Sequence, residues 1–193
     1  MFPVLNDSSI EKSYGNAREL YAQYGVDTEA AMKKLAAIAI SLHCWQGDDV
    51  GGFEGQTSFE GSGIAATGNY PGKPRTADEL RNDLDKTLSL IPGTHRLNLQ
   101  ASYGDFSGKN VDRNEYRPEF YTAWIDWAKS KGMGLDFNPT CFGHPKASTS
   151  FTLSHSDSGI RQFWIDHCIA SRKIGEHMGK ALGTPCVTNI WIP

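Results

Sequence analysis

Apolar and polar positions along the chain follow two spacings, which alternate from one end to the other. Segments with apolar residues three or four positions apart are typical of amphipathic helices, and short apolar runs between them are typical of buried strands. We expect helices over residues 8–24, 27–35, 76–90, 117–131 and 157–182. We expect strands over residues 36–42, 95–101, 134–137 and 186–192. Strands that alternate with helices in this way favour parallel β-α-β units.

Polar and aromatic residues follow the expected strands closely, above all the first one. The apolar run 36–42 leads directly into His43 and Trp45 and then into a glycine-rich loop. Active sites of (β/α)8 barrels lie at the carboxyl ends of their strands, so this pattern is typical of that fold. A flavodoxin-like open sheet is the alternative, although residues 51–55 match neither glycine-rich phosphate-loop pattern.

The length of the chain limits how much of a barrel it can form. A complete (β/α)8 barrel has about 250 residues, whereas this chain has 193. We therefore expect an α/β fold that is the amino-terminal half of a barrel, in one incomplete domain over residues 1–193. Residues 1–37 are expected as an amino-terminal helical extension, and residues 38–193 as four strand–helix units.

Composition and charge exclude several classes of protein. The net charge is −3 and the Lys and Arg residues are scattered, which gives no reason to expect nucleic-acid binding. No apolar run approaches the roughly 20 residues that a membrane span needs, and the first residues do not form a signal peptide. The four cysteines form no C-x-x-C pair and are expected as reduced thiols of a cytoplasmic protein. They are Cys44, Cys141, Cys168 and Cys186.

The five tryptophans fall into two groups. Trp45 and Trp191 lie at the carboxyl ends of expected strands, where a flat ring can stack on the C–H face of a sugar; a core aromatic is the alternative for each. Trp124, Trp127 and Trp164 lie at helical spacing, and we expect them to pack in the core.

Three aspartates are candidates for chemistry. Asp48 and Asp49 offer carboxylates for a metal or for sugar hydroxyls, but adjacent carboxylates on a glycine-rich loop are also typical of caps and turns. Asp136 lies within an apolar strand, and a buried carboxylate needs a partner. A salt bridge to an arginine is the expected partner.

Histidines supply the candidate bases. His43, His144 and His155 lie in or near loops that follow expected strands. No pair of them has the spacing that places two metal ligands on one helix face. His167 and His177 lie on the last expected helix, where surface or packing roles are expected.

Five sequence blocks together resemble the L-rhamnose isomerase family. In each of them the residue order resembles the family pattern, and the blocks follow one another in the family's order across most of residues 15–193. They are residues 41–50 (SLHCWQGDDV), 67–73 (TGNYPGK), 134–139 (GLDFNP), 163–168 (FWIDHC) and 189–193 (NIWIP).

The resemblance implies a cytoplasmic, homotetrameric barrel enzyme that interconverts L-rhamnose and L-rhamnulose. The family uses two divalent cations, typically manganese, in a hydride shift between C2 and C1 of the open sugar. The resemblance makes Trp45, Trp191, Phe142 and Gln100 the expected substrate contacts. The loop over residues 51–75 matches the family's long first loop, which contributes to closure over the substrate.

Two departures from the family pattern qualify this expectation. Gln100 replaces a histidine that is common in the family, and an amide cannot transfer a proton near neutral pH. The family's metal ligands lie on later strands, so we expect no metal ligand in this chain and no activity of the chain alone. The expectation is an amino-terminal part of the enzyme; a non-catalytic half-barrel with a sugar-binding or assembly role is the alternative.

Overall fold

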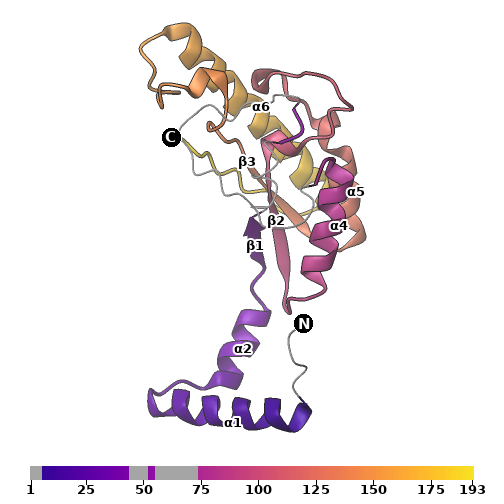
Figure 1. Ribbon diagram of the computed structural model, residues 1–193, viewed down its shortest axis with the longest axis vertical. Coiled ribbons are helices and arrows are strands. Elements are labelled where there is room, and N and C mark those ends of the chain that lie inside the picture. The colour runs from indigo at the N-terminus through magenta and orange to yellow at the C-terminus, as the bar shows by residue number, and fades with distance from the viewer. Residues whose placement is uncertain (1–5, 44–51, 55–73) are drawn as a thin grey trace. The chain divides into compact units, whose positions relative to one another are not determined.

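The computed structural model describes residues 6–43, 52–54 and 74–193 (Figure 1). It divides into two compact units, Met1–Ala39 and Ile40–Pro193, and each is described by itself. The single incomplete domain over residues 1–193 stays a prediction.

The first unit contains two helices, α1 (Asp7–Gln23) and α2 (Thr28–Ala36). Asp27 caps α2, because its carboxylate accepts from the backbone N–H of Ala30 at 3.0 Å. Tyr14 of α1 donates to Glu29 of α2 at 2.6 Å. Neither helix has a buried residue, so hydrogen bonds rather than a core join them.

The second unit contains a parallel sheet in the order β1-β2-β3. The strands are β1 (Ile40–His43), β2 (His95–Gln100) and β3 (Gly134–Asn138). They confirm three of the expected strands and the α/β class. The first strand begins later than expected because α2 extends to Ala36. Closure of the sheet into half a barrel stays a prediction.

The expected fourth strand is not a regular strand. Residues 186–192 run parallel to β3 but pair with it only at isolated bridges, Phe137 with Thr188 and Thr140 with Trp191. Phe137 N–H donates to the carbonyl oxygen of Val187 at 2.8 Å, and Cys141 N–H donates to the carbonyl oxygen of Trp191 at 2.8 Å. Between them stands Pro139, which has no N–H to donate, and this missing donor interrupts the ladder.

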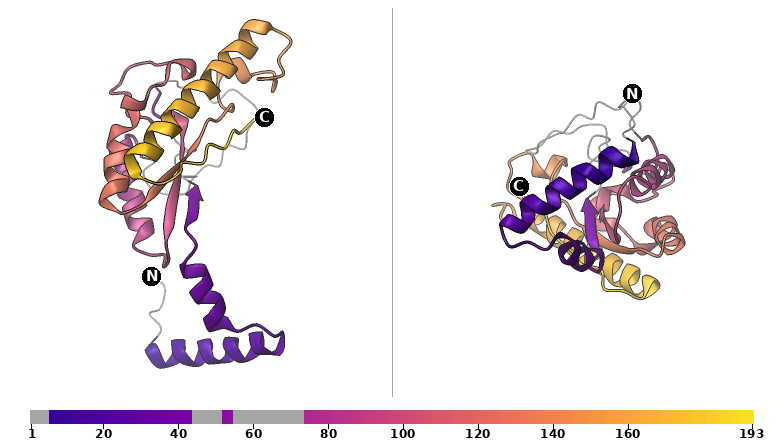
Figure 2. Two further views of the ribbon diagram at one scale, coloured as in Figure 1. Left: turned by 180° about the vertical axis from the view of Figure 1, so that it is seen from behind. Right: turned by 90° about the horizontal axis from the view of Figure 1, so that it is seen from below.

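Three α-helices of the second unit form an arc on one side of the sheet (Figure 2). They are α4 (Ala77–Leu88), α5 (Thr122–Ser130) and α6 (Ser158–Leu182). Thr76 and Asp157 cap α4 and α6, and Gly183 ends α6 with φ +65°. Glu79 does not form a capping box with Thr76, because its carboxylate accepts from Arg75 N–H instead of Thr76 N–H. No helix among the described ranges is long and apolar enough to cross a membrane.

The core lies between this arc and one face of the sheet. Its fully buried side chains come from both strands and helices; they include Leu80, Leu97, Leu99, Trp124, Leu135, Phe137, Ile174 and Met178. Trp124 and Trp164 are fully buried and Trp127 is half-buried, which confirms their expected packing roles. Trp164 lies in a second, smaller cluster with Phe163 and Cys141.

Two glycines of α6 allow the segment 183–188 to run close to the helix. A Cβ at Gly175 would lie 2.8 Å from Thr188 Oγ1, and one at Gly179 would lie 3.2 Å from the carbonyl oxygen of Thr184. A side chain at either position would therefore push the segment away from α6.

Candidate functional site

The candidate site lies on the face of the sheet that the helices do not cover. Alternate residues of a strand point to opposite faces. Leu97 and Leu99 point into the core, so Arg96, Asn98 and Gln100 point to the other face. The register pairs Asn98 with Asp136 and Gln100 with Asn138. Polar side chains of neighbouring strands therefore lie side by side, and we call this surface the polar face.

An ion pair occupies the amino-terminal part of the polar face. Arg96 Nη2 lies 2.9 Å from Asp136 Oδ1, and Arg96 Nε donates to Oδ2 at 3.0 Å. Ser41 Oγ and the N–H of Val187 donate to the same carboxylate at 2.7 and 2.9 Å. Burial alone would raise the pKa of Asp136, but these hydrogen bonds outweigh it and lower the pKa. Asp136 is thus an ionised structural group, and its expected salt bridge to an arginine is confirmed.

A ring pair and an amide pair follow towards the carboxyl ends of the strands. His43 and Trp191 stack with ring centroids 5.4 Å apart and planes 28° apart. Asn98 Nδ2 lies 3.3 Å from His43 Nε2, and the amides of Asn98 and Asn189 approach to 3.0 Å. With its amide oxygen towards Trp191, Asn189 accepts from the indole N–H at 2.9 Å. Segments far apart in the sequence thus place an aromatic surface beside amide groups.

Gln100 and Asn138 form the last pair on this face. Gln100 is 9% exposed and Asn138 is 1% exposed. In the described part of the chain, neither amide atom of Asn138 has a hydrogen-bond partner. Buried amides are nearly always paired with protein or water, so Asn138 is an unusual feature of this end of the sheet.

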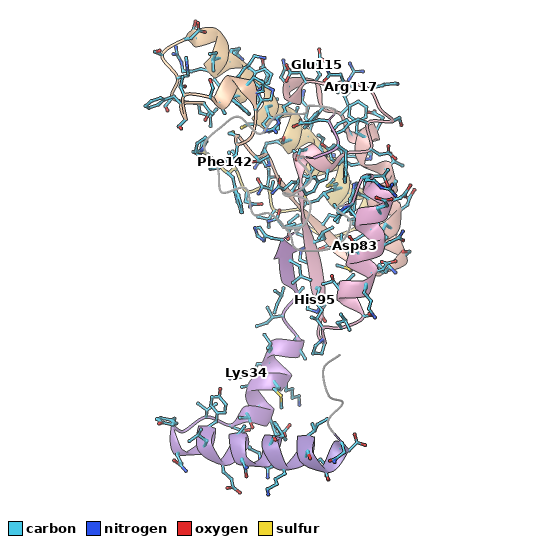
Figure 3. The ribbon with its side chains drawn as sticks, viewed as in Figure 1. Lys34, Asp83, His95, Glu115, Arg117 and Phe142 are labelled. Atoms are coloured by element: carbon cyan, nitrogen blue, oxygen red, sulfur yellow. The ribbon has the colours of Figure 1, made fainter. Side chains whose placement is uncertain are left out.

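Phe142 lies on the loop that follows β3. The side chain is half-buried, and in Figure 3 it lies to the left of the sheet, whereas Asp83 of α4 lies to the right. The neighbouring Cys141 N–H donates to Trp191, so this loop is tied to the segment that carries the indole. The structure therefore brings Gln100, Trp191 and the Phe142 loop to the same end of the sheet.

The remaining candidates lie elsewhere or outside the described residues. Trp45, Asp48 and Asp49 belong to residues 44–51, which the structure does not describe. His155 is half-buried, and its Nδ1 accepts from the backbone N–H of Asp157 at 2.9 Å, whereas His177 is exposed.

His144 is buried and its two ring nitrogens have structural partners. Nε2 lies 3.0 Å from Asp112 Oδ1, and Nδ1 accepts from the N–H of Lys146 at 3.1 Å. Its ring stacks on Phe163 at 5.0 Å. Burial, followed by the charge of Arg113, lowers the pKa of His144, so the neutral ring is favoured. A neutral ring with both nitrogens engaged is not a free base.

The part of the chain that the structure describes offers no cluster of three or more His, Cys, Asp or Glu side chains that could hold a metal ion. A surface pocket of about 500 Å³ lies between α6 and residues 183–188, and its lining includes none of the predicted substrate contacts.

Several residues of the polar face carry no recognisable signal in the sequence. Asn98 and Asn189 lie 91 positions apart and meet only because β2 and the last segment flank β3. The alternation of apolar and polar residues over 95–100 is the one pattern that indicates such a face.

Comparisons with known proteins identify the family. The family model described as L-rhamnose isomerase (RhaA) matches residues 8–193. L-rhamnose isomerase of Rhodopirellula baltica is 56% identical over 185 residues, which are 96% of this chain and 43% of that protein. The enzymes of Klebsiella pneumoniae (strain 342) and Citrobacter koseri are 53% and 51% identical over 96% of this chain and 44% of their own length. The chain thus spans less than half the length of these relatives, and it belongs to the L-rhamnose isomerase family.

Proposed function

We propose that this chain forms the amino-terminal, substrate-binding part of an enzyme that converts L-rhamnose to L-rhamnulose. The observation that carries the proposal is the polar face, where an aromatic pair lies beside a row of amides. Together with membership of the family, this surface has the chemistry that a sugar requires. Aromatic rings pack on C–H groups, and amides both donate to and accept from hydroxyls.

The proposed roles follow from the chemistry of each side chain. Trp191 forms an apolar wall that keeps water away from the carbon atoms that react. Asn98 and Gln100 hydrogen-bond to sugar hydroxyls and orient the open chain. Phe142 closes the wall from the loop after β3. Trp45 is proposed to complete it from residues that the structure does not describe.

In the proposed reaction an aldose becomes a ketose. One hydrogen moves from C2 to C1 as a hydride, and one proton moves from the C2 hydroxyl to the C1 oxygen, so atoms and electrons balance. Gln100 cannot carry that proton, because its amide does not titrate near neutral pH. The residues of the polar face therefore bind the sugar and exclude water. Proton transfer is assigned to other groups.

The two divalent cations, with manganese proposed, would polarise the sugar oxygens. We propose that their ligands come from the part of the relatives' length that this chain does not span. No step assigned to the described residues depends on a metal. The homotetrameric state and the cytoplasmic location are proposed on the same basis as the substrate.

A chimera tests the proposal. Residues 8–193 would replace the matching part of the Rhodopirellula baltica enzyme, and formation of L-rhamnulose would be measured with manganese present. We expect isomerisation by the chimera and none by the 193-residue chain alone. A folded, metal-loaded chimera without activity would contradict the proposal. Conversion by the isolated chain would contradict the assignment of the metal ligands, and sugar binding without conversion by the chimera would favour the binding-module alternative.

A further inference from the structure

A buried ion pair lies beside the predicted site and joins loops that are distant in the sequence. Arg113 and Glu54 are 3% and 1% exposed. We propose that they are positioning residues, which fix the loop over residues 140–143 and thereby the aromatic walls at Phe142 and Trp191. The inference rests on the proposed function for the role of those walls, but the positioning itself has an independent test.

All five N–H donors of the Arg113 guanidinium are occupied. Nε donates to Glu54 at 3.1 Å, and Nη2 donates to Glu54 Oε1 at 2.7 Å. Nη1 donates to the carbonyl oxygens of Thr140 and Phe142 at 3.0 and 2.6 Å. Nη2 also donates to the carbonyl oxygen of Gly143 at 2.9 Å. The group therefore has no donor left for a ligand, and its role is to hold the protein.

The pair balances its charge inside the protein. Burial opposes the charge on Arg113, but the neighbouring Glu54 outweighs it and raises the pKa of the guanidinium. Burial, followed by the charge of Glu54, raises the pKa of Tyr116 well above its ordinary value. Tyr116 therefore keeps its proton and donates it in a hydrogen bond to Glu54. Removing one charge would leave the other buried and unpaired.

The pair also joins two further parts of the unit. Glu54 follows Phe53, whose N–H donates to the carbonyl oxygen of Ser102 beyond β2 at 2.8 Å. The backbone carbonyl of Arg113 lies 3.0 Å from Nδ1 of His167 on α6. Arg113 therefore stands between the loops after β1, β2 and β3 and the helix behind them.

The carbonyls that Arg113 holds determine the course of the loop after β3. Gly143 has φ +60°, a conformation that other residues rarely adopt, and its carbonyl is one of the three. The carbonyls of Thr140 and Phe142 flank Cys141, whose N–H donates to Trp191. One guanidinium thus fixes both the backbone of Phe142 and the hydrogen bond that attaches the Trp191 segment.

Lysine cannot replace this arrangement. It has three donors on one flexible ammonium, whereas arginine has five in a fixed plane. Arg113→Lys keeps the charge beside Glu54, but with one of its three donors on Glu54 it loses at least one of the three loop contacts. We expect the charge beside Glu54 to be kept and the loop over residues 140–143 to be held less firmly.

Kinetics and hydrogen exchange on the chimera test the inference together. For Arg113→Lys we expect the KM for L-rhamnose to rise about tenfold or more, with a smaller change in kcat, since the walls bind the sugar but do not exchange protons. Backbone amides of residues 140–143 and 187–192 should exchange about tenfold faster at unchanged global stability. Leu80→Ala, a core substitution on α4, is the matched control: it should lower stability and leave both the KM and the relative exchange of these segments unchanged.

A double variant separates positioning from folding. Glu54→Leu combined with Arg113→Met removes both charges, so no unpaired charge remains and stability should recover relative to Arg113→Met alone. The raised KM and the fast exchange should persist, because the loop contacts are still missing. A normal KM and slow exchange in the double variant would overturn the inference. If the unmodified chimera had no activity, the proposed function would fail, and the exchange data would still decide the positioning role.

Discussion

The two faces of one small sheet differ in how their side chains are stabilised. On the face towards the helices, Leu97 and Phe137 are fully buried among other apolar groups. On the polar face, Asn98 and Asp136 are almost as buried, at 6% and 4% exposure, but each has hydrogen-bond partners. Residues next to each other in a strand thus meet different physical requirements. One face needs matching volume, and the other needs matching donors and acceptors.

This difference indicates where a substitution affects stability and where it affects function. Packing interactions are numerous and are lost together when a large side chain is removed. Polar contacts are few and specific, so their loss changes geometry at one place. We expect variants of the apolar face to unfold the unit, and variants of the polar face to change sugar binding.

The largest expected effect on stability comes from a comparison of two tryptophans, Trp124 in the core and Trp191 at the polar face. Trp124→Ala should lower the free energy of unfolding by about 3–5 kcal/mol, because a fully buried ring is replaced by a cavity. Trp191→Ala should lower it much less, since that ring is half-exposed, but should reduce isomerisation by the chimera more per folded molecule. Urea denaturation and specific activity measure the two effects. Equal specific activities would refute the wall role of Trp191.

A second prediction concerns a titratable group on the helix side. Burial, followed by the charge of Arg113, lowers the pKa of His167 to about 4. The unfolded chain binds this proton near pH 6.5, whereas the folded protein does not until about pH 4, so stability falls as the pH falls through this window. Between pH 7 and pH 5 the expected loss from His167 is about 2 kcal/mol.

His167→Asn provides the control for that pH dependence. Asparagine keeps a donor near the position of Nδ1 but does not titrate. Urea midpoints at pH 7 and pH 5 should differ less in this variant than in the unsubstituted chain. Burial also lowers the pKa of His144, which is present in both proteins, so its own contribution is common to them. Identical pH dependence in the two proteins would mean that folding does not lower the pKa of His167.

The smallest expected effect is a gain in stability on the polar face. Asn138→Leu replaces a buried amide that lacks a partner among the described residues with an apolar side chain of similar size. We expect the free energy of unfolding to rise by about 1 kcal/mol. Asn98→Leu should lower it, because His43 and Asn189 would each lose one hydrogen-bond partner. A loss for Asn138→Leu as large as that for Asn98→Leu would show that Asn138 is paired.

Local patterns in the sequence predicted most of the elements. The helix starts near residues 76 and 157 were predictable because a cap, here Thr76 and Asp157, depends only on the next three residues. The fourth strand was predicted as regular, but its ladder of hydrogen bonds is interrupted by Pro139 of the neighbouring segment after β3. A pattern within residues 186–192 cannot contain that information.

Part of the site was predictable because a buried charged residue needs a partner of opposite charge. A carboxylate within an apolar strand required a cation, and Arg96 meets that requirement. Glu54 and Arg113 were missed because they are 59 positions apart and neither lies in an α-helix or a strand. Only the folded loops bring them together. Trp191, Gln100 and Phe142 stay predicted substrate contacts.

The absence of side chains at Gly175 and Gly179 has a consequence for how this family can vary. The last segment lies so close to α6 that these two helix positions have no room for a Cβ without displacement. A mutational scan would therefore report both positions as intolerant, as it would for a catalytic residue, although neither has a functional group. Intolerance at Gly175 would result from the short distance between the helix and the neighbouring segment. A smaller residue in place of Thr188 would be the expected compensating change.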